Sequence, residues 1–327
     1  MSAAAEVGVD DHDNESGYGD EGSTTSCSIE SYVYRYEEKY GRTYHNYNPG
    51  SYIYPNDERE QDRLDLVHHI CTLRLDGRLF LAPIESDKRS LDVLDIGTGT
   101  GIWAIDFGDE YPGASVFGVD LSPIQPVFVP PNVRFHVDDV EQDWKGSNYD
   151  FIHCRYMAGS IADWPALVGR IYSHLKPGGW AELQETINTL YSEDDSLKAD
   201  NALVRLMDNL KMAHAKIGRI LDPAPSFKIW LERAGFHHVK VQKFKLPVGM
   251  WPKDERLKDI GACMAQNFVD GVDAFTAKPF RDTLGWPAEQ VEVLNMLVRR
   301  AARNKSVHAV FDFVVVTAQK PYTTTHS

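Results

Sequence analysis

Long apolar runs are missing from this chain of 327 residues, although 43% of its residues are hydrophobic. A helix that spans a bilayer needs about 20 predominantly apolar residues in succession, so we expect no membrane span. The first 22 residues also lack the basic start and the apolar core of a secretory signal. Both absences predict a cytoplasmic protein.

Cysteine is scarce, and its positions form no pattern. The chain has four cysteines, without a Cys-x-x-Cys pair: Cys27, Cys71, Cys154 and Cys263. Disulfide frameworks and cysteine zinc sites need denser or more regular spacing, so a reducing compartment fits. We expect no metal site at His68 and His69 either, because two ligands on one helical face are usually four residues apart.

Basic residues are outnumbered, with 34 Lys and Arg against 48 Asp and Glu and a net charge of −14. Binding to a phosphate backbone requires a basic surface, so we expect no nucleic-acid partner. Residues 1–34 contain eight acids and no Lys or Arg. Residues 1–29 are also poor in large apolar side chains, which predicts a disordered acidic tail. Such a tail is either simply solvated or docks a protein partner.

Tyrosine, by contrast, is abundant near the N-terminus, with eight in residues 31–54. This segment either forms a lid over a site or wraps the core. A helix is predicted directly after it, because Asn56 or Asp57 can cap a helix whose first turn is acidic. Gly77 is a plausible end of that helix.

From residue 91 onwards, apolar strand-like runs alternate with helix-like segments. The strand-like runs are 91–96, 115–119, 132–137, 149–154, 179–187, 237–245 and 308–318. Helices are expected around 56–77, 101–110, 162–174, 197–217, 226–235, 254–268 and 287–304, with Pro287 in the first turn of the last. This alternation predicts an α/β fold with a doubly wound, mostly parallel sheet. Helical insertions near 193–222 and 253–305 interrupt it, so the last strand is expected to be antiparallel.

A glycine-rich turn, Asp95-Ile-Gly97-Thr98-Gly99-Thr-Gly101, joins the first of these strands to a helix. Glycine there allows a ligand to approach the backbone closely, and a helix start favours anionic groups. The phosphate-binding loop of ATPases is excluded because no Lys-Ser/Thr follows. The dinucleotide fingerprint requires glycine where Ile102 stands. Ile102 therefore disfavours a nicotinamide dinucleotide, and with it an oxidoreductase, and S-adenosylmethionine (SAM) fits better, with Asp95 near its ammonium group.

Three later strand ends carry polar groups that suit the same ligand. Asp120, followed by Leu121, can accept both ribose hydroxyls, although SAM and NAD share that feature. Asp139 can accept from the adenine amine, with the amide of Val140 beside it. Cys154 and Arg155 end the next strand. Ligands of open α/β sheets bind at the carboxyl ends of strands, so we expect all these residues at one site.

The motifs DIGTGTG, GVDLS, HVDDVEQDW, YDFIHCR and LKPGGW occur in this order. With them the chain resembles the class I SAM-dependent methyltransferases over residues 88–190. Upstream, YGRTYHNYNPGSYIYPNDEREQDRLDLVHHICTLRLDGRLFLAP resembles the front of the LaeA-like methyltransferases of filamentous fungi. Together the two extend the resemblance over residues 32–246.

The resemblance implies a Rossmann-like sheet of seven strands, one of them antiparallel, and SAM as methyl donor. It divides the chain into the tail (1–29), a tyrosine-rich segment with a helix (30–85) and a methyltransferase domain (86–327). Some members of the family methylate fungal natural products, and others are regulators of secondary metabolism and development that act in the nucleus or with protein partners. The glycine motif is degenerate in some regulators but intact here, which favours SAM binding.

We therefore expect methyl transfer to an oxygen or nitrogen of a small fungal secondary metabolite. The alternative is a regulatory methyltransferase, or a SAM-binding subunit, that acts through protein partners, with the nucleus as a further compartment.

The catalytic base, if one is needed, is not identified by the sequence. The candidates are His68, His69, His153, His214 and the tyrosines at 44, 47, 52 and 54, and we single out His69 and Tyr52. Arg63 is expected either to meet the SAM carboxylate or to form a salt bridge. An apolar acceptor pocket is expected within the insertions, from Met207, Met212, Met250, Trp251, Met264 and Phe268.

Overall fold

A computed structural model describes residues 36–48, 50–84, 90–146 and 148–322 of the chain. The acidic tail predicted for residues 1–29 lies outside these residues. Within the described part, no helix is both long and apolar enough to cross a membrane.

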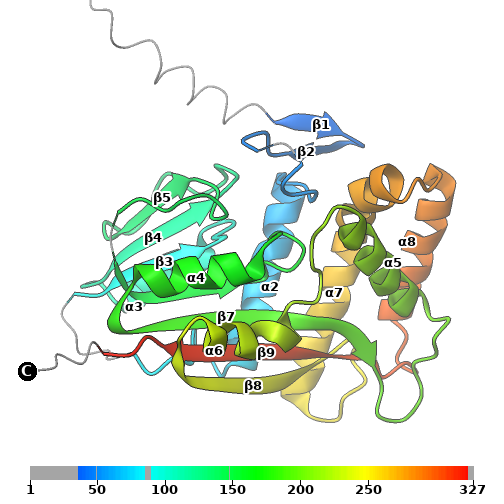
Figure 1. Ribbon diagram of the computed structural model, residues 1–327. Helices are drawn as coiled ribbons and strands as arrows, with labels where there is room; N and C mark the ends of the chain where they lie inside the picture. Colours follow the sequence, from blue (N-terminus) through cyan, green and yellow to red (C-terminus); the bar gives the residue numbers. More distant parts are fainter. Residues whose placement is uncertain (1–35, 49, 85–89, 147, 323–327) are drawn as a thin grey trace, which may run out of the picture.

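The centre of the fold is a seven-stranded sheet with the order β5-β4-β3-β6-β7-β9-β8 (Figure 1). The five strands from β5 to β7 are parallel, whereas β9 pairs antiparallel with both β7 and β8. This confirms the predicted doubly wound sheet with its last strand antiparallel. The strands are β3 (Asp92–Ile96), β4 (Ser115–Asp120), β5 (Val133–Val137), β6 (Tyr149–Arg155), β7 (Leu175–Tyr191), β8 (His237–Pro247) and β9 (Val310–Gln319).

Strand β7 departs most from its predicted bounds, because it extends four residues further at each end. Its first residue, Leu175, lies opposite Tyr149 of β6, and its last, Tyr191, lies opposite Val310 of β9. The Pro-Gly-Gly sequence that suggests a turn lies inside this strand. Pairing continues there because the amide of Gly178 donates to the carbonyl of Lys320 at 2.9 Å.

Helices cover both faces of the sheet. Helices α4 (Trp164–His174) and α6 (Phe227–Arg233) pack on one face, over alternate residues of β3 and β6 such as Ile96 and Ile152. Helix α3 (Ile102–Glu110) packs on the other face. Successive side chains of a strand point to opposite faces, so continuously apolar strands are what a sheet covered on both sides requires.

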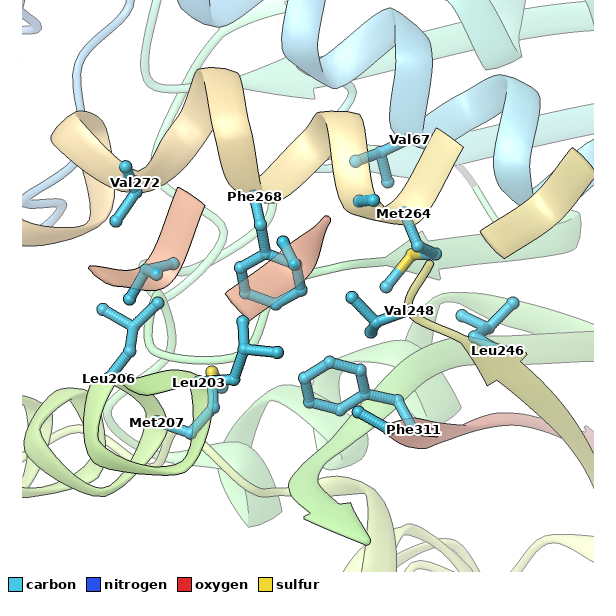
Figure 2. Close-up of a cluster of buried hydrophobic side chains, with 14 of the residues drawn as sticks. Val67, Leu203, Leu206, Met207, Leu246, Val248, Met264, Phe268, Val272 and Phe311 are labelled. Atoms are coloured by element: carbon cyan, nitrogen blue, oxygen red, sulfur yellow. The ribbon is translucent and has the colours of Figure 1, made fainter. Parts of the chain in front are cut away.

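The two predicted insertions fold together into a helical lobe beside the β7–β9–β8 end of the sheet (Figure 1). The lobe consists of α5 (Ala202–Lys216), α7 (Glu255–Lys278), the π-helical turn η2 (Pro279–Thr283) and α8 (Ala288–Ala302). Figure 2 shows its contact with the sheet, where Phe268 and Met264 of α7 face Phe311 of β9. Burial of these side chains attaches the lobe to the sheet.

Two predicted helix details in the lobe are wrong. Helix α7 runs ten residues beyond the expected end at 268, through Gly271, to Lys278. Glycine suits this position because α2 packs closely against it: a Cβ at Gly271 would lie 2.5 Å from Cδ of Arg63. Pro287 is the residue before α8 rather than part of its first turn, with an extended ψ of 149°.

The N-terminal segment contributes a small hairpin and a helix. Strands β1 (Glu37–Lys39) and β2 (Arg42–Tyr44) were not anticipated, and they pair antiparallel around Tyr40 and Gly41. Both turn residues have positive φ, 53° and 69°, as a two-residue hairpin turn of the favoured hand requires. Helix α2 (Glu58–Arg74) follows, and the side chain of Asp57 caps it by accepting from the amide of Glu60.

Candidate functional site

A cavity, here called the first cavity, lies at the carboxyl ends of β3, β4, β5 and β6. The strand order reverses between β3 and β6. From β3, the chain continues on one side with β4 and β5, and then crosses to the other side of β3 to form β6 and β7. Loops diverge at such a switch point and leave a crevice. The predicted residues Asp95, Gly97, Thr98, Gly99, Asp120, Leu121, Asp139, Val140 and Arg155 line this cavity.

Asp95 holds the glycine turn through a buried network. Its Oδ2 accepts a hydrogen bond from Oγ1 of Thr98 at 2.6 Å, and its Oδ1 accepts one from Nδ1 of His153 at 2.7 Å. Burial lowers the pKa of His153, which favours the neutral ring with its proton on Nδ1. The ring stacks on Trp103 with 3.8 Å between centroids. His153, one of the base candidates, therefore serves to position Asp95.

The three glycines of the turn face different neighbours. A Cβ at Gly97 would overlap the side chain of Met157, and one at Gly101 would overlap the ring of Phe135. A Cβ at Gly99 would meet only Cδ1 of Leu64, at 3.6 Å. All three residues have positive φ. Gly97 and Gly101 are therefore required by packing within the protein, whereas Gly99 presents its backbone to the cavity.

Asp120 ends β4 and fixes the same turn from the other side. Its two carboxylate oxygens accept from the amides of Gly99 and Ser122, both at 2.9 Å. Burial raises the pKa of Asp120. Each carboxylate oxygen has a second lone pair, so the group can accept further hydrogen bonds from a bound diol.

Asp139, which follows the next strand, β5, is buried, and its carboxylate already accepts hydrogen bonds from the protein. Its Oδ1 accepts from the amide of Glu141 at 2.9 Å, and its Oδ2 accepts from Nδ2 of Asn48 at 2.9 Å. Asn48 belongs to the tyrosine-rich segment, 91 residues away in sequence. The N-terminal segment therefore reaches the first cavity.

Arg155 ends β6 and is oriented by a chain of side chains that sequence reasoning missed. Its Nη2 donates to Nδ1 of His68 at 2.9 Å, and Nε2 of His68 lies 2.9 Å from Oδ2 of Asp106. Arginine only donates, so Nδ1 of His68 accepts and Nε2 carries the proton toward Asp106. A sequence gives no spacing signal for such contacts between α2, α3 and β6.

Three predicted residues do not line the first cavity. Cys154 is 2% exposed and packs in the core under α4, because alternation points it to the face opposite Arg155. Arg63 donates to Glu60 through Nε and Nη2 and to Asn267 through Nη1. Gly101 caps α3 behind the turn.

The candidate bases His69 and Tyr52 have different surroundings. The side chain of His69 is exposed on α2, whereas that of its neighbour His68 is buried. Tyr52 lines the first cavity and also a second one. Of the pair of candidates, Tyr52 is therefore the residue that a bound ligand can reach.

The second cavity lies between the helical lobe, α2 and β7. It shares Tyr52, Leu64, Val67, Tyr156 and Ser160 with the first cavity, so the two adjoin. Met207, Met264 and Phe268 line it as expected, and Glu185, Asn188 and Asn267 add polar groups. Met212 and Met250 are instead about half exposed, at 52% and 49%, and Trp251 packs against His308.

Residues 36–48 and 50–56, here called the strap, lie along both cavities, with Ser51 lining the first and Tyr54 the second. On the lobe side, Lys39 and Tyr40 donate to Asp282 at 2.8 and 2.6 Å. On the sheet side, Asn48 bonds Asp139, and Tyr52 stands between the cavities. The strap therefore connects the lobe with the first cavity.

Comparisons with known proteins agree with this geometry. Residues 64–241 match the model of a family described as a methyltransferase domain. The chain is 58% identical to "Methyltransferase pytC" of Aspergillus terreus over 301 residues, which cover 91% of this chain and 92% of that protein. It is 36% identical to "Secondary metabolism regulator LAE1" of Cochliobolus heterostrophus over 287 residues, 86% of this chain and 94% of that protein. It is also 36% identical to "Protein-methionine methyltransferase laeA" of Emericella nidulans over 292 residues, which cover 88% of this chain and 77% of that protein.

Proposed function

The chain belongs to the class I SAM-dependent methyltransferase family, and we propose that it methylates an oxygen or nitrogen of a small fungal secondary metabolite. The second cavity carries this proposal. It is lined in large part by apolar side chains of the helical lobe and adjoins the first cavity through five shared residues. A small, largely apolar molecule suits such a pocket, in which a few polar groups set its orientation.

SAM supplies a methyl group on a positively charged sulfur that leaves as a neutral thioether. We propose that Asp120 accepts from its ribose hydroxyls and that Asp139, with the amide of Val140, binds the adenine. Arg155 is proposed to pair with the carboxylate. The bonds of Arg63 to Glu60 support Arg155 rather than Arg63 in that role. The open side of Gly99 supports a cofactor lying across the turn.

The residues of the chain contribute mainly by positioning. Holding an acceptor in line with the methyl group contributes on the order of 7–11 kcal/mol to the lowering of a barrier. We propose that the strap and the lobe help to exclude water from both cavities when ligands are bound, which would strengthen the electrostatic interactions inside them.

Calorimetry with SAM and with NAD tests the proposed cofactor contacts. We expect SAM to bind, NAD not to bind, and Asp120→Ala to abolish SAM binding, because a buried ribose would lose its acceptor. Asp109→Ala, an exposed carboxylate on α3, is the matched control. Equal SAM affinity in the Asp120 variant and the wild type would contradict the assignment.

The acceptor is tested with metabolite extracts of a producing strain with and without the gene. We expect a compound that is heavier by one methylene unit only where the gene is present. A regulatory role is the alternative, since two of the relatives are named as a secondary metabolism regulator and a protein-methionine methyltransferase. Changed abundance of many unrelated compounds, with no methylated product formed in vitro, would favour that alternative.

A further inference from the structure

Tyr54 and His214 form a hydrogen-bonded pair at the wall of the second cavity. Tyr54, at the end of the strap, lines that cavity. Its hydroxyl lies 3.2 Å from Nε2 of His214, near the end of α5. The two residues are 160 positions apart in sequence, and the cofactor contacts described above do not involve them.

The partners of His214 define which nitrogen carries its proton. Nδ1 lies 2.9 Å from the carbonyl oxygen of Leu210. A carbonyl only accepts, so the proton is on Nδ1. In a neutral imidazole the other nitrogen is then an acceptor, and the phenol of Tyr54 donates to it. The pair is therefore joined by a hydrogen bond from the phenolic O–H of Tyr54 to the basic Nε2 of His214.

The surroundings of the pair keep both groups uncharged. His214 is fully buried, and burial followed by the positive charge of Arg219 lowers its pKa. Burial raises the pKa of Tyr54. The charge of Arg63 on α2 lowers this pKa, and that of Glu60 raises it. At neutral pH, His214 is therefore a free base and Tyr54 a phenol.

The local packing makes room for the imidazole. A Cβ at Gly159 would lie 2.5 Å from Cδ2 and 2.6 Å from Nε2 of the ring. Gly159 lies in the same short segment as Tyr156 and Ser160, which line both cavities. The pair is thus held beside the segment that lines both cavities, with Tyr54 itself in the wall of the second.

We propose that Tyr54 and His214 form a proton relay for an acceptor hydroxyl bound in the second cavity. This proposal rests on the proposed function. The proton of the acceptor passes to Oη of Tyr54 while the phenolic proton of Tyr54 passes to Nε2 of His214. The acceptor oxygen uses the released electron pair for its bond to the methyl carbon, and the pair of the broken carbon–sulfur bond stays on sulfur. His214 is left protonated and returns the proton to solvent after product release.

The relay defines a class of acceptor. A phenol or enol is a weak nucleophile until it loses its proton, whereas a neutral amine needs no base before it attacks. Tyr54 is flanked by Tyr52 and Phe275, with ring centroids 5.5 and 6.2 Å away in edge-on geometry. Aromatic edges of this kind suit a planar ring, so a phenolic or enolic aromatic compound is the acceptor expected.

Glu185 is the rival base in the second cavity. Burial raises its pKa to about 8, so it is mostly protonated at neutral pH. Its oxygens also accept from the amides of Ala158 and Thr186, at 2.8 and 2.9 Å. The bond from Ala158 attaches the segment 156–160 to β7, which indicates a structural role.

The test compares Tyr54→Phe and His214→Asn with the wild type. Labelled SAM is supplied with a metabolite extract from a strain that lacks the gene, and label in solvent-extractable product is measured. Each variant should lose roughly 10²–10⁴-fold in rate, as expected for a missing base, and the double variant should lose no more than the worse single one. SAM affinity by calorimetry should stay unchanged. Asparagine preserves a donor for the Leu210 carbonyl.

Matched controls are Tyr191→Phe and His174→Asn. Tyr191 donates to Asp312 at 2.8 Å, and Nδ1 of His174 bonds the carbonyl of Arg170 at 3.0 Å, four residues earlier, as His214 does with Leu210. Both controls should keep wild-type rates. A Tyr54→Phe rate above half of the wild-type rate, with Glu185→Gln inactive, would overturn the relay.

Nitrogen NMR of the imidazole tests the pair without turnover. At pH 7 His214 should be neutral with its proton on Nδ1, and Nε2 should shift in Tyr54→Phe. A proton on Nε2 would overturn the relay. A wild-type enzyme that labels nothing in the extract would instead count against the proposed function, and the NMR result would still decide the relay.

Discussion

Arg155 donates through Nη2 to Nδ1 of His68, at 2.9 Å, across the junction between β6 and α2. His68 in turn contacts Asp106 at 2.9 Å. The donor and the acceptor of both hydrogen bonds in this Arg155–His68–Asp106 series are therefore fixed. The guanidinium is thus oriented in the first cavity before any ligand binds. Preorganisation of this kind reduces the ordering cost of binding.

We predict that His68→Ala weakens SAM binding about two- to tenfold, because one positioning hydrogen bond contributes about 0.5–1.5 kcal/mol. His69→Ala, which removes the exposed neighbouring imidazole, should leave the affinity unchanged. Calorimetric titration of both variants measures this. If the two variants bind SAM equally well, Arg155 does not depend on His68.

Loosening the strap should speed ligand exchange with little change in stability. Asp282→Ala removes the acceptor of both Lys39 and Tyr40. Such exposed interactions contribute about 0–1 kcal/mol to folding, but here they hold a segment over both cavities. Stopped-flow release of S-adenosylhomocysteine should become several-fold faster, whereas Asp109→Ala should match the wild type. Unchanged release would show that the strap does not limit exchange.

The glycine turn gives a stability test. Gly97→Ala should destabilise the fold more than Gly77→Ala, although both residues have positive φ, 66° and 80°. At Gly77 a Cβ meets nothing within 4 Å, so only the backbone cost of about 1–2 kcal/mol applies. At Gly97 the Cβ overlaps Met157, which adds roughly 1–3 kcal/mol. Urea unfolding measures both, and equal losses would contradict the packing argument.

Stability should fall as the pH rises from about 5 to 8. Burial raises the pKa of Glu182 to about 7 and that of Glu185 to about 8, above the value of about 4.3 for an unfolded glutamate. The folded state therefore holds more protons in this window, and stability decreases with pH until both groups are ionised in both states.

Glu182→Gln should remove part of this dependence, roughly 1–3 kcal/mol between pH 5 and 8. Its amide oxygen can still accept from the amides of Leu81 and Ala82, as Oε2 of Glu182 does, whereas the bond that Oε1 of Glu182 accepts from Nε2 of Gln184 is lost. Urea midpoints at pH 5 and pH 8 provide the measurement. An identical pH slope in the variant would exclude Glu182 as the titrating group.

The sheet was predictable because strand signals are local. Alternating apolar runs placed all seven strands of the sheet, and polar residues at strand ends, such as Asp120 and Asp139, indicated its binding edge. Hairpin β1–β2 was missed because its strands are three residues long and its turn depends on a positive φ at Tyr40. A run this short carries no measurable periodicity.

Side-chain partners at long range could not be read from spacing. The contacts of Arg155 with His68 and of Tyr54 with His214 span 87 and 160 residues, and depend on how α2 and α5 dock. For Arg63 a local signal was present, since Glu60 stands three residues earlier on the same helix. Successive residues of a helix point about 100° apart, so at most one of His68 and His69 faces inward, but this angle does not indicate which one.

The adjoining cavities share five residues, and the rest of their walls come from different parts of the chain. The first cavity, proposed to bind SAM, is built largely by strand ends, and the second, proposed to bind the acceptor, largely by α5 and α7. Substitutions at Met207 or Phe268 can therefore reshape one pocket while the strand-end carboxylates stay in place. If the proposed assignment of the two cavities holds, acceptor specificity can be altered through the lobe while the methyl-donor site is left unchanged.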